Sequence, residues 1–249
     1  MAAISLCEAP LAHLKKRLMD EFVEVKSSHL TEALASSMGF RTHAALKAAM
    51  TGPEEDRPFY LLDPEQFLTR LTQFGYPLDP KDPEFDFDLW HDQYGVTKTM
   101  PTSGYDIEYK TPRERAWRNL MVCGVNAALE QKLFTLRPGD DRFDDNMRSG
   151  HLFDFVLPNG LPARGSIADA GFDELAVHVA VNPKGDRVRY FEAGFTAGDV
   201  FGTTWLERRN GAWLQSTTNG FRCRKPFLEQ LAELDVKPQG FGDRGKLIM

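Results

Sequence analysis

The sequence has few cysteines and none of the cysteine patterns that build a metal or redox site. Cys7, Cys123 and Cys223 lie far apart in the chain, and no Cys-x-x-Cys pair is present. This excludes the common zinc ribbons and dithiol redox motifs. Scattered thiols of this kind are typical of a reducing compartment. We therefore expect a cytoplasmic protein with no structural metal and no cofactor.

The sequence also lacks a hydrophobic run long enough to cross a bilayer. Its first residues, MAAISLCEAPLAHLKKR, place the basic residues after a short apolar stretch and not before it. A secretory signal has the opposite order. The sequence thus predicts neither secretion nor membrane insertion.

Familiar catalytic motifs are missing too. There is no G-x-S-x-G, P-loop or dinucleotide fingerprint, and the six histidines form no HExxH, HxH or Cys/His cluster. His178 alternates with Val177 and Val179, so on a strand it faces away from them. A locally hydrogen-bonded strand histidine is the commoner situation, and a catalytic base on the sheet is the alternative. We favour a non-enzymatic protein.

The sequence has fewer basic than acidic residues. The chain carries 30 Lys and Arg against 36 Asp and Glu, a formal net charge of −6 at pH 7. A protein that binds nucleic acid through phosphates is normally basic or has a concentrated basic face. The balance favours a partner with a basic surface, either a protein or a ribonucleoprotein complex, over direct nucleic-acid binding.

The apolar pattern predicts an α+β protein with a helical front and a β-rich back. Residues 1–52 are expected to form a three-helix module. Residues 53–110 are expected to form a proline-rich acidic connector with one short helix at 64–74, capped by Asp63. Residues 111–249 are expected to form an α+β domain.

The predicted α+β domain begins with the strongest helix signal in the chain. Thr111-Pro112-Arg113-Glu114 has the cap, the first-turn proline and the glutamate of a capping box, and the helix is expected to reach about Phe134. Three hairpins then follow, around the turns 158–160, 182–186 and 210–211. They predict an antiparallel sheet of about six strands, followed by a short helix at 226–234 and a loose tail.

The N-terminal module allows a second interpretation, a helix-turn-helix DNA-binding regulator. Gly39 ends one predicted helix, and the next helix, THAALKAAM, would enter a groove. That helix offers only Thr42, His43 and Lys47 for base contacts. Residues 1–50 hold six basic and five acidic side chains, so a packing or protein-docking role is favoured.

An acidic and aromatic stretch, DPKDPEFDFDLWHD, supplies the candidate contact surface. It is expected to be an extended loop packed by Phe85, Phe87 and Trp90. Because these aromatic residues lie among carboxylates, they are also candidate anchors for a partner. Its carboxylates do not have the spacing of an EF-hand, and the required glycine is missing. The predicted partner-binding residues are Glu84, Phe85, Asp86, Phe87, Asp88, Trp90 and Asp92.

Polar residues on the predicted strands leave two possibilities open, a polar site or ordinary cross-strand pairs on a wet face. These residues are Arg187, Arg189, Tyr190, Glu192, Glu207 and Arg208. If Asn210-Gly211 is a two-residue turn, Arg208 is expected to lie opposite Trp213 and to make a cation–π contact.

Two stretches carry a family resemblance. SSHLTEALASSMGFRTHAALKAAM resembles the N-terminal helical module of uncharacterised accessory proteins of bacterial plasmids and integrative elements, and KTPRERAWRNLMVCGVNAALEQKLFTLRPGD is similar to a second block in them. The resemblance implies a mobile-element protein, a setting that includes inhibitors of host defence of the anti-CRISPR type. The sequence thus favours a non-catalytic binding protein, with a DNA-binding regulator or an enzyme with a pocket on the sheet as alternatives.

Overall fold

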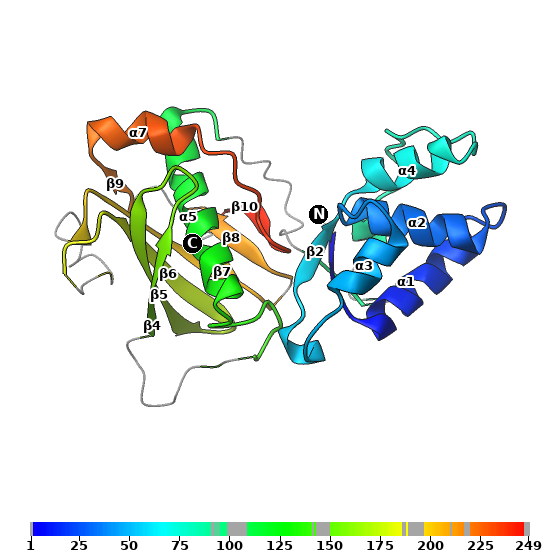
Figure 1. Ribbon diagram of the computed structural model, residues 1–249, viewed down its shortest axis with the longest axis horizontal. Helices are drawn as coiled ribbons and strands as arrows, with labels where there is room; N and C mark the ends of the chain where they lie inside the picture. Colours follow the sequence, from blue (N-terminus) through cyan, green and yellow to red (C-terminus); the bar gives the residue numbers. More distant parts are fainter. Residues whose placement is uncertain are drawn as a thin grey trace. The chain divides into compact units, whose positions relative to one another are not determined.

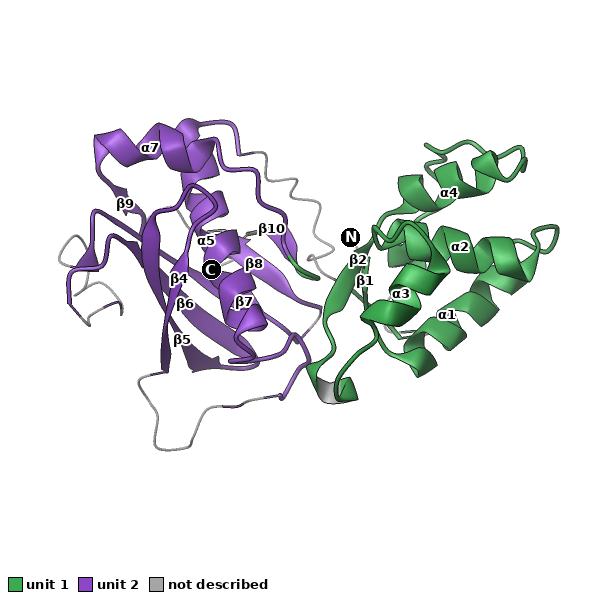
Figure 2. Ribbon diagram, viewed as in Figure 1, with its two compact units in different colours: residues 1–99, 239–241 green, residues 100–238, 242–249 purple. Residues whose placement is uncertain are grey.

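The computed structural model describes residues 2–90, 93, 95–98, 109–140, 142, 150–185, 188, 197–209, 211–216 and 220–246. Contacts divide the chain into two compact units (Figure 2). Unit 1 comprises residues 1–99 and 239–241, and unit 2 comprises residues 100–238 and 242–249. The fold is α+β, as the sequence predicts, with N-terminal helices, one long helix, a mostly antiparallel sheet and a short C-terminal helix (Figure 1).

Unit 1 combines a small sheet with helices. Its strands are arranged in the order β2-β1-β3, and both pairs are antiparallel. The elements of unit 1 in chain order are β1 (Ala2–Ser5), α1 (Glu8–Glu21), α2 (Ser27–Ser37), α3 (His43–Ala49), η1 (Glu54–Asp56), β2 (Phe59–Leu62), α4 (Pro64–Gln73), η2 (Phe87–Trp90) and β3 (Val96–Lys98).

The first strand of unit 1 changes the predicted domain organisation. Ile4 in β1 pairs with Tyr60 in β2 and with Val96 in β3. Two strands from the expected connector therefore complete a sheet with the N-terminal module. One core cluster includes residues from β1, α1, α2, α4 and η2. The division near residue 99 thus differs from the expected divisions at 52 and 110.

The short helix expected within residues 53–110 is confirmed as α4. Asp63 accepts a hydrogen bond from the Gln66 backbone N–H at 3.0 Å, and Pro64 occupies the first helical position. An N-terminal proline loses no helical hydrogen bond, and its fixed φ suits the helix. The helix places Phe67 and Leu71 in the core of unit 1.

Unit 2 is built on a seven-stranded sheet with the order β10-β8-β7-β6-β5-β4, in which β9 also pairs with β7. Helix α5 lies over the sheet, and α7 packs beside α5 (Figure 1). The elements of unit 2 in chain order are α5 (Pro112–Glu130), β4 (His151–Val156), β5 (Pro162–Gly171), β6 (Glu174–Val181), β7 (Val200–Glu207), β8 (Trp213–Ser216), β9 (Arg222–Cys223), α7 (Lys225–Ala232) and β10 (Gly242–Lys246).

The capping box that the sequence predicts for α5 is confirmed. The Glu114 backbone N–H donates to Thr111 Oγ1 at 3.2 Å, and the Thr111 backbone N–H donates to Glu114 Oε2 at 2.8 Å. The helix ends at Glu130, one turn before the expected Phe134, and Lys132 then adopts a left-handed φ of 57°. Gly124 lets α5 approach the sheet, because a Cβ there would lie 2.4 Å from Val179 Cγ2.

The hairpins agree with the sequence in part. β4 and β5 pair across the predicted 158–160 turn, with Asp154 opposite Arg164. β5 and β6 form a hairpin that the sequence did not predict, and its turn is Phe172-Asp173. The predicted strand after turn 182–186 lies outside the described residues, except for Val188.

The C-terminal segment is not a loose tail up to Lys246. β10 pairs in parallel with β8, and Gly242 lies opposite Trp213. The Arg118 guanidinium forms an ion pair with Asp243 at 2.6 Å. Strand pairing and this ion pair supply the order that the sequence did not predict.

Candidate functional site

The predicted acidic loop is a chain of tight turns in unit 1. The side chains of Asp79, Asp82 and Asp86 each accept a hydrogen bond from the backbone N–H two residues further on, at 2.9, 2.9 and 3.0 Å. Such Asx turns use one carboxylate oxygen to fix the local backbone. The loop therefore has a defined conformation, and the expected extended form is wrong.

The aromatic rings of this loop point into unit 1. Phe87 is 0% and Trp90 7% exposed, and Phe85 is half-buried. Phe85 lies 5.3 Å from both Phe67 and Phe22, measured between ring centroids. Phe85, Phe87 and Trp90 therefore pack the loop, as the sequence predicts, because rings from distant parts of unit 1 lie against Phe85 and Phe87. Their role in partner binding stays a prediction.

The outer surface of the loop carries mainly carboxylates, together with the exposed Lys81, Pro83 and Leu89. Asp79, Asp82 and Glu84 are exposed, Asp86 and Asp88 are partly exposed, and Leu89 is 65% exposed. Asp92 lies outside the described residues. We call residues 79–89 the acidic edge. Leu89 is the large apolar side chain that this edge exposes.

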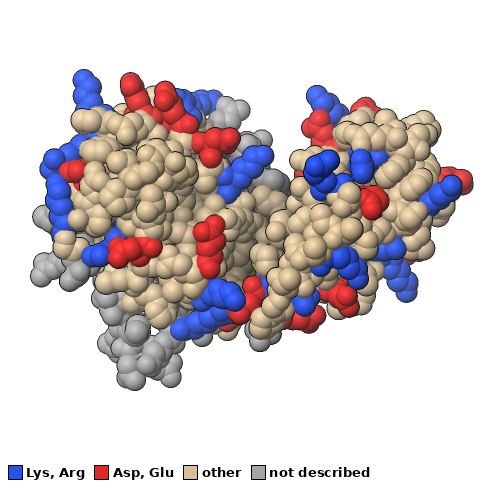
Figure 3. Space-filling model, in the orientation of Figure 1, with Lys and Arg blue, Asp and Glu red and all other residues tan. Residues whose placement is uncertain are grey.

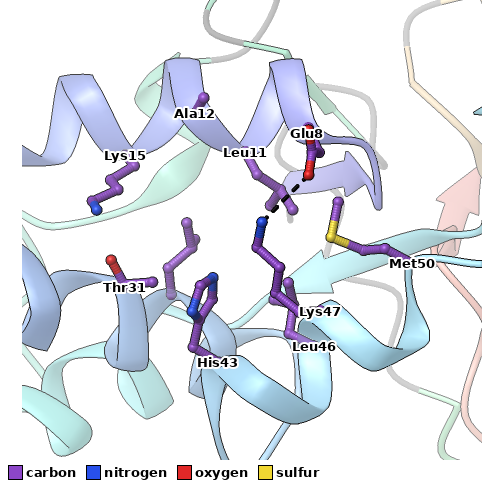
Figure 4. A pocket seen from close by; sticks show the side chains of 10 residues that line it. Glu8, Leu11, Ala12, Lys15, Thr31, His43, Leu46, Lys47 and Met50 are labelled. Atoms are coloured by element: carbon purple, nitrogen blue, oxygen red, sulfur yellow. Dashed lines mark hydrogen bonds and ion pairs between the residues drawn. The ribbon is translucent and has the colours of Figure 1, made fainter.

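A pocket of about 300 Å³ lies between α1, α2 and α3 in unit 1 (Figure 4). Both α1 and α3 pack against α2. The pocket has an apolar lining with polar groups at its rim. The lining residues are Glu8, Leu11, Ala12, Lys15, Thr31, Leu34, His43, Leu46, Lys47 and Met50.

The side chains of the predicted DNA-reading helix contact other parts of unit 1. Thr42 caps α3 by accepting from the Ala45 backbone N–H at 3.1 Å. His43 and Lys47 line the pocket, and Lys47 forms an ion pair with Glu8 at 3.3 Å. α3 is only seven residues long. These contacts give the helix a role in unit 1 itself.

His178 is a buried link between two strands. Its side chain is 6% exposed, and its Nδ1 lies 2.8 Å from Thr203 Oγ1. The imidazole is nearly parallel to the Phe201 ring, with 6.1 Å between the centroids. Val179 packs under α5, so His178 faces the opposite side of the sheet, as its alternation predicts. These contacts are those of a packed strand histidine.

The prediction that Arg208 lies opposite Trp213 is wrong. Trp213 lies opposite Glu207, one residue away from the predicted register. Arg208 is buried, and its guanidinium donates to the carbonyl oxygens of Thr135 and Asp140 at 3.1 and 2.7 Å. The arginine therefore fixes the segment that follows α5. Arg187, Arg189, Tyr190 and Glu192 lie outside the described residues.

Two carboxyl groups lie close together on the sheet, and no local sequence pattern predicts that they do. Glu174 and Glu207 lie opposite each other on β6 and β7. The Gln215 amide donates to Glu174 at 2.6 Å, and the Arg209 backbone N–H donates to Glu207 at 2.6 Å. Burial, followed by the nearby Glu174 carboxylate, raises the pKa of Glu207. Only the register of two strands brings these residues together.

In the described part of the chain, neither charge (Figure 3) nor metal ligands mark a further site. On the face in Figure 3, basic and acidic side chains are interspersed. Within the described ranges, no three His, Cys, Asp or Glu side chains are grouped to hold a metal ion. No helix in that part of the chain is long and apolar enough to cross a membrane.

Comparison with protein-family models, with curated proteins and with solved structures gives no match. Among the described residues, the acidic edge and the pocket between α1, α2 and α3 are two surface features with a defined geometry.

Proposed function

We propose that the chain is a non-catalytic binding protein that acts by contact with another macromolecule. Its partner is a protein or ribonucleoprotein complex with a basic surface, and the acidic edge of unit 1 is the contact. One observation carries the proposal. The acidic edge presents Asp82, Glu84 and the 65% exposed Leu89 from a backbone that its own side chains hold in place.

Preorganisation is the physical reason to favour this edge. A mobile loop loses conformational entropy when it binds, whereas a loop held by Asx turns and buried rings loses little. The Asp86 turn lies between Phe85 and Phe87, whose rings reach into the core. The carboxylates are thus held outward without help from a partner.

The chemistry of the edge suits a basic partner with an apolar depression. An apolar residue within a polar rim is the usual anatomy of a contact patch. The exposed carboxylates of the loop that carries Leu89 would attract Lys and Arg at long range and increase the association rate. The mobile-element setting that the sequence resemblance implies extends the proposal to an inhibitor that occupies a basic surface of a host defence complex, as an anti-CRISPR protein does.

Capture from a lysate of the native host tests the proposal. We expect the immobilised full chain to retain a specific macromolecule at low salt, and Leu89→Ser to lose it. Val156→Ser is the control, because Val156 on β4 has a similar exposure, 67% against 65% for Leu89. A parallel nuclease-treated lysate separates a protein from a ribonucleoprotein. Equal retention by both variants, or retention of nucleic acid alone, would contradict the proposal.

A further inference from the structure

The pocket between α1, α2 and α3 has two ends of different chemistry. Glu8 and Lys15 are seven positions apart on α1, which corresponds to about 10 Å along the helix. Lys47 pairs with Glu8 at one end. His43 is one turn before Lys47 on α3, and Figure 4 shows it on the side of Lys15 and Thr31.

The polar end has capacity for a ligand. In the part of the chain that the structure describes, neither the Lys15 ammonium nor the His43 ring makes a hydrogen bond or ion pair with the protein. Thr31 donates its hydroxyl proton to the Ser27 carbonyl at 2.8 Å and keeps acceptor capacity only. The available groups at this end are therefore one lysine ammonium and one imidazole, both hydrogen-bond donors that suit an anion.

The middle of the pocket is apolar. Leu11 on α1, Leu34 on α2 and Leu46 on α3 line it, and Leu34 and Leu46 are buried. Ala12 is exposed at the rim, so its small side chain leaves the pocket open. An apolar cavity of about 300 Å³ with a few polar groups at its rim is at the small end of the usual size for ligand sites.

We propose that this pocket binds a small apolar carboxylate. The carboxylate lies at Lys15 and His43, and its hydrocarbon chain lies along Leu11, Leu34 and Leu46. An extended eight-carbon acid is roughly 8 Å long at the rise per bond of an extended chain. That length fits the distance between the Lys15 end and the Glu8–Lys47 pair.

Charge decides the class of ligand. A cationic amphiphile would place its ammonium group beside Lys15, where like charges repel. At the other end, Glu8 is already neutralised by Lys47. An uncharged alcohol gains the apolar contacts but no ion pair with the lysine. The order of affinity is therefore carboxylate, then alcohol, then amine.

Octanoate is the probe that tests this site, with octanol and octylamine as comparison ligands. Titration of the full chain, followed by two-dimensional NMR, is expected to shift the amides of the pocket residues at millimolar octanoate, about the affinity of such a small ligand. Octylamine is expected to bind at least about tenfold more weakly. No shift at the pocket with octanoate, or equal binding of octylamine, would overturn the proposal. This comparison needs no substitution, so it does not depend on a variant that folds.

Two matched pairs of variants then locate the site. Lys15→Glu is expected to weaken octanoate binding about tenfold, whereas Lys16→Glu, on the next residue of α1 and outside the pocket, changes it by less than about twofold. Ala12→Phe fills the mouth and is expected to abolish binding, and Ala9→Phe is its exposed control. If Lys15→Glu behaves like Lys16→Glu, the carboxylate does not lie at Lys15 and the proposal fails.

Discussion

The Phe85 ring stacks on the Phe67 ring, with 5.3 Å between the centroids and 23° between the planes. Phe67 belongs to the buried face of α4, and Phe85 belongs to the acidic edge. The contact ties a surface loop to the core of unit 1. It explains how a stretch rich in proline and aspartate keeps one conformation.

Phe85→Ala is expected to lower the free energy of unfolding of unit 1 by about 2 kcal/mol. The ring is half-buried, so the loss is smaller than for a fully buried phenylalanine. Denaturant unfolding followed by tryptophan fluorescence measures it. Leu89→Ser on the outer surface should change stability by no more than about 0.5 kcal/mol. Equal stability of Phe85→Ala and the wild type would mean that the ring does not hold the loop.

Glu114→Gln tests the capping box through the pH dependence of stability. Hydrogen bonds from Thr111, first from its backbone N–H and then involving its side chain, lower the pKa of Glu114 below 4.5. The ionised carboxylate therefore stabilises the fold above about pH 4.5, and this contribution disappears as the pH falls. Gln keeps the box geometry but does not titrate. The wild type should lose more stability than Glu114→Gln in urea unfolding between pH 5 and pH 3, and parallel curves would argue against the box.

Glu207→Gln should show the opposite pH dependence. The pKa of Glu207 is raised above 4.5 by burial and by Glu174, so the folded state favours the protonated form. Folding stability then falls as the pH rises from 4.5 through the raised pKa. Relative to the wild type, Glu207→Gln should gain stability between pH 4.5 and pH 8. Glu229→Gln, on the exposed side of α7, is the control and should show no such gain.

Gly124→Ala should destabilise unit 2 although alanine favours helices. An added methyl group would lie 2.4 Å from Val179 Cγ2, so the helix or the strand must move. We expect a net loss of about 1–3 kcal/mol in unfolding free energy, because overpacking exceeds the helix-propensity gain of about 1 kcal/mol. Unfolding monitored by circular dichroism checks it. A more stable variant would mean that α5 does not pack this closely on the sheet.

Local signals in the sequence predicted the helix starts that depend on local chemistry. The Asp63 cap and the Thr111–Glu114 box each lie within four residues, so their geometry can be read directly from the sequence. The β4–β5 turn was equally local, because Gly160 can adopt its positive φ of 84° at no steric cost.

Long-range pairing explains what the sequence did not show. β1 is four residues long, and Ala2 pairs with Leu62 and Lys98, far along the chain. The burial of Phe85 likewise depends on Phe22 and Phe67. The pocket takes its lining from three helices, which no local sequence pattern can bring together. The one local signal is the four-residue spacing of Leu11 and Lys15, which places an apolar and a basic side chain on the same face of α1.

The most direct test of the acidic edge measures binding of the captured partner to a neutralised variant. Asp79→Asn, Asp82→Asn, Glu84→Gln and Asp86→Asn remove four charges and keep the side-chain oxygens that accept the turn hydrogen bonds. Asp169→Asn, Glu229→Gln, Glu233→Gln and Asp235→Asn remove as many charges from unit 2 and form the control.

We expect the edge variant to bind at least about tenfold more weakly at low salt, the control variant to match the wild type, and the difference to shrink near roughly 0.5 M salt, where charges are screened. Equal affinity of the edge variant and the control at low salt would contradict the account.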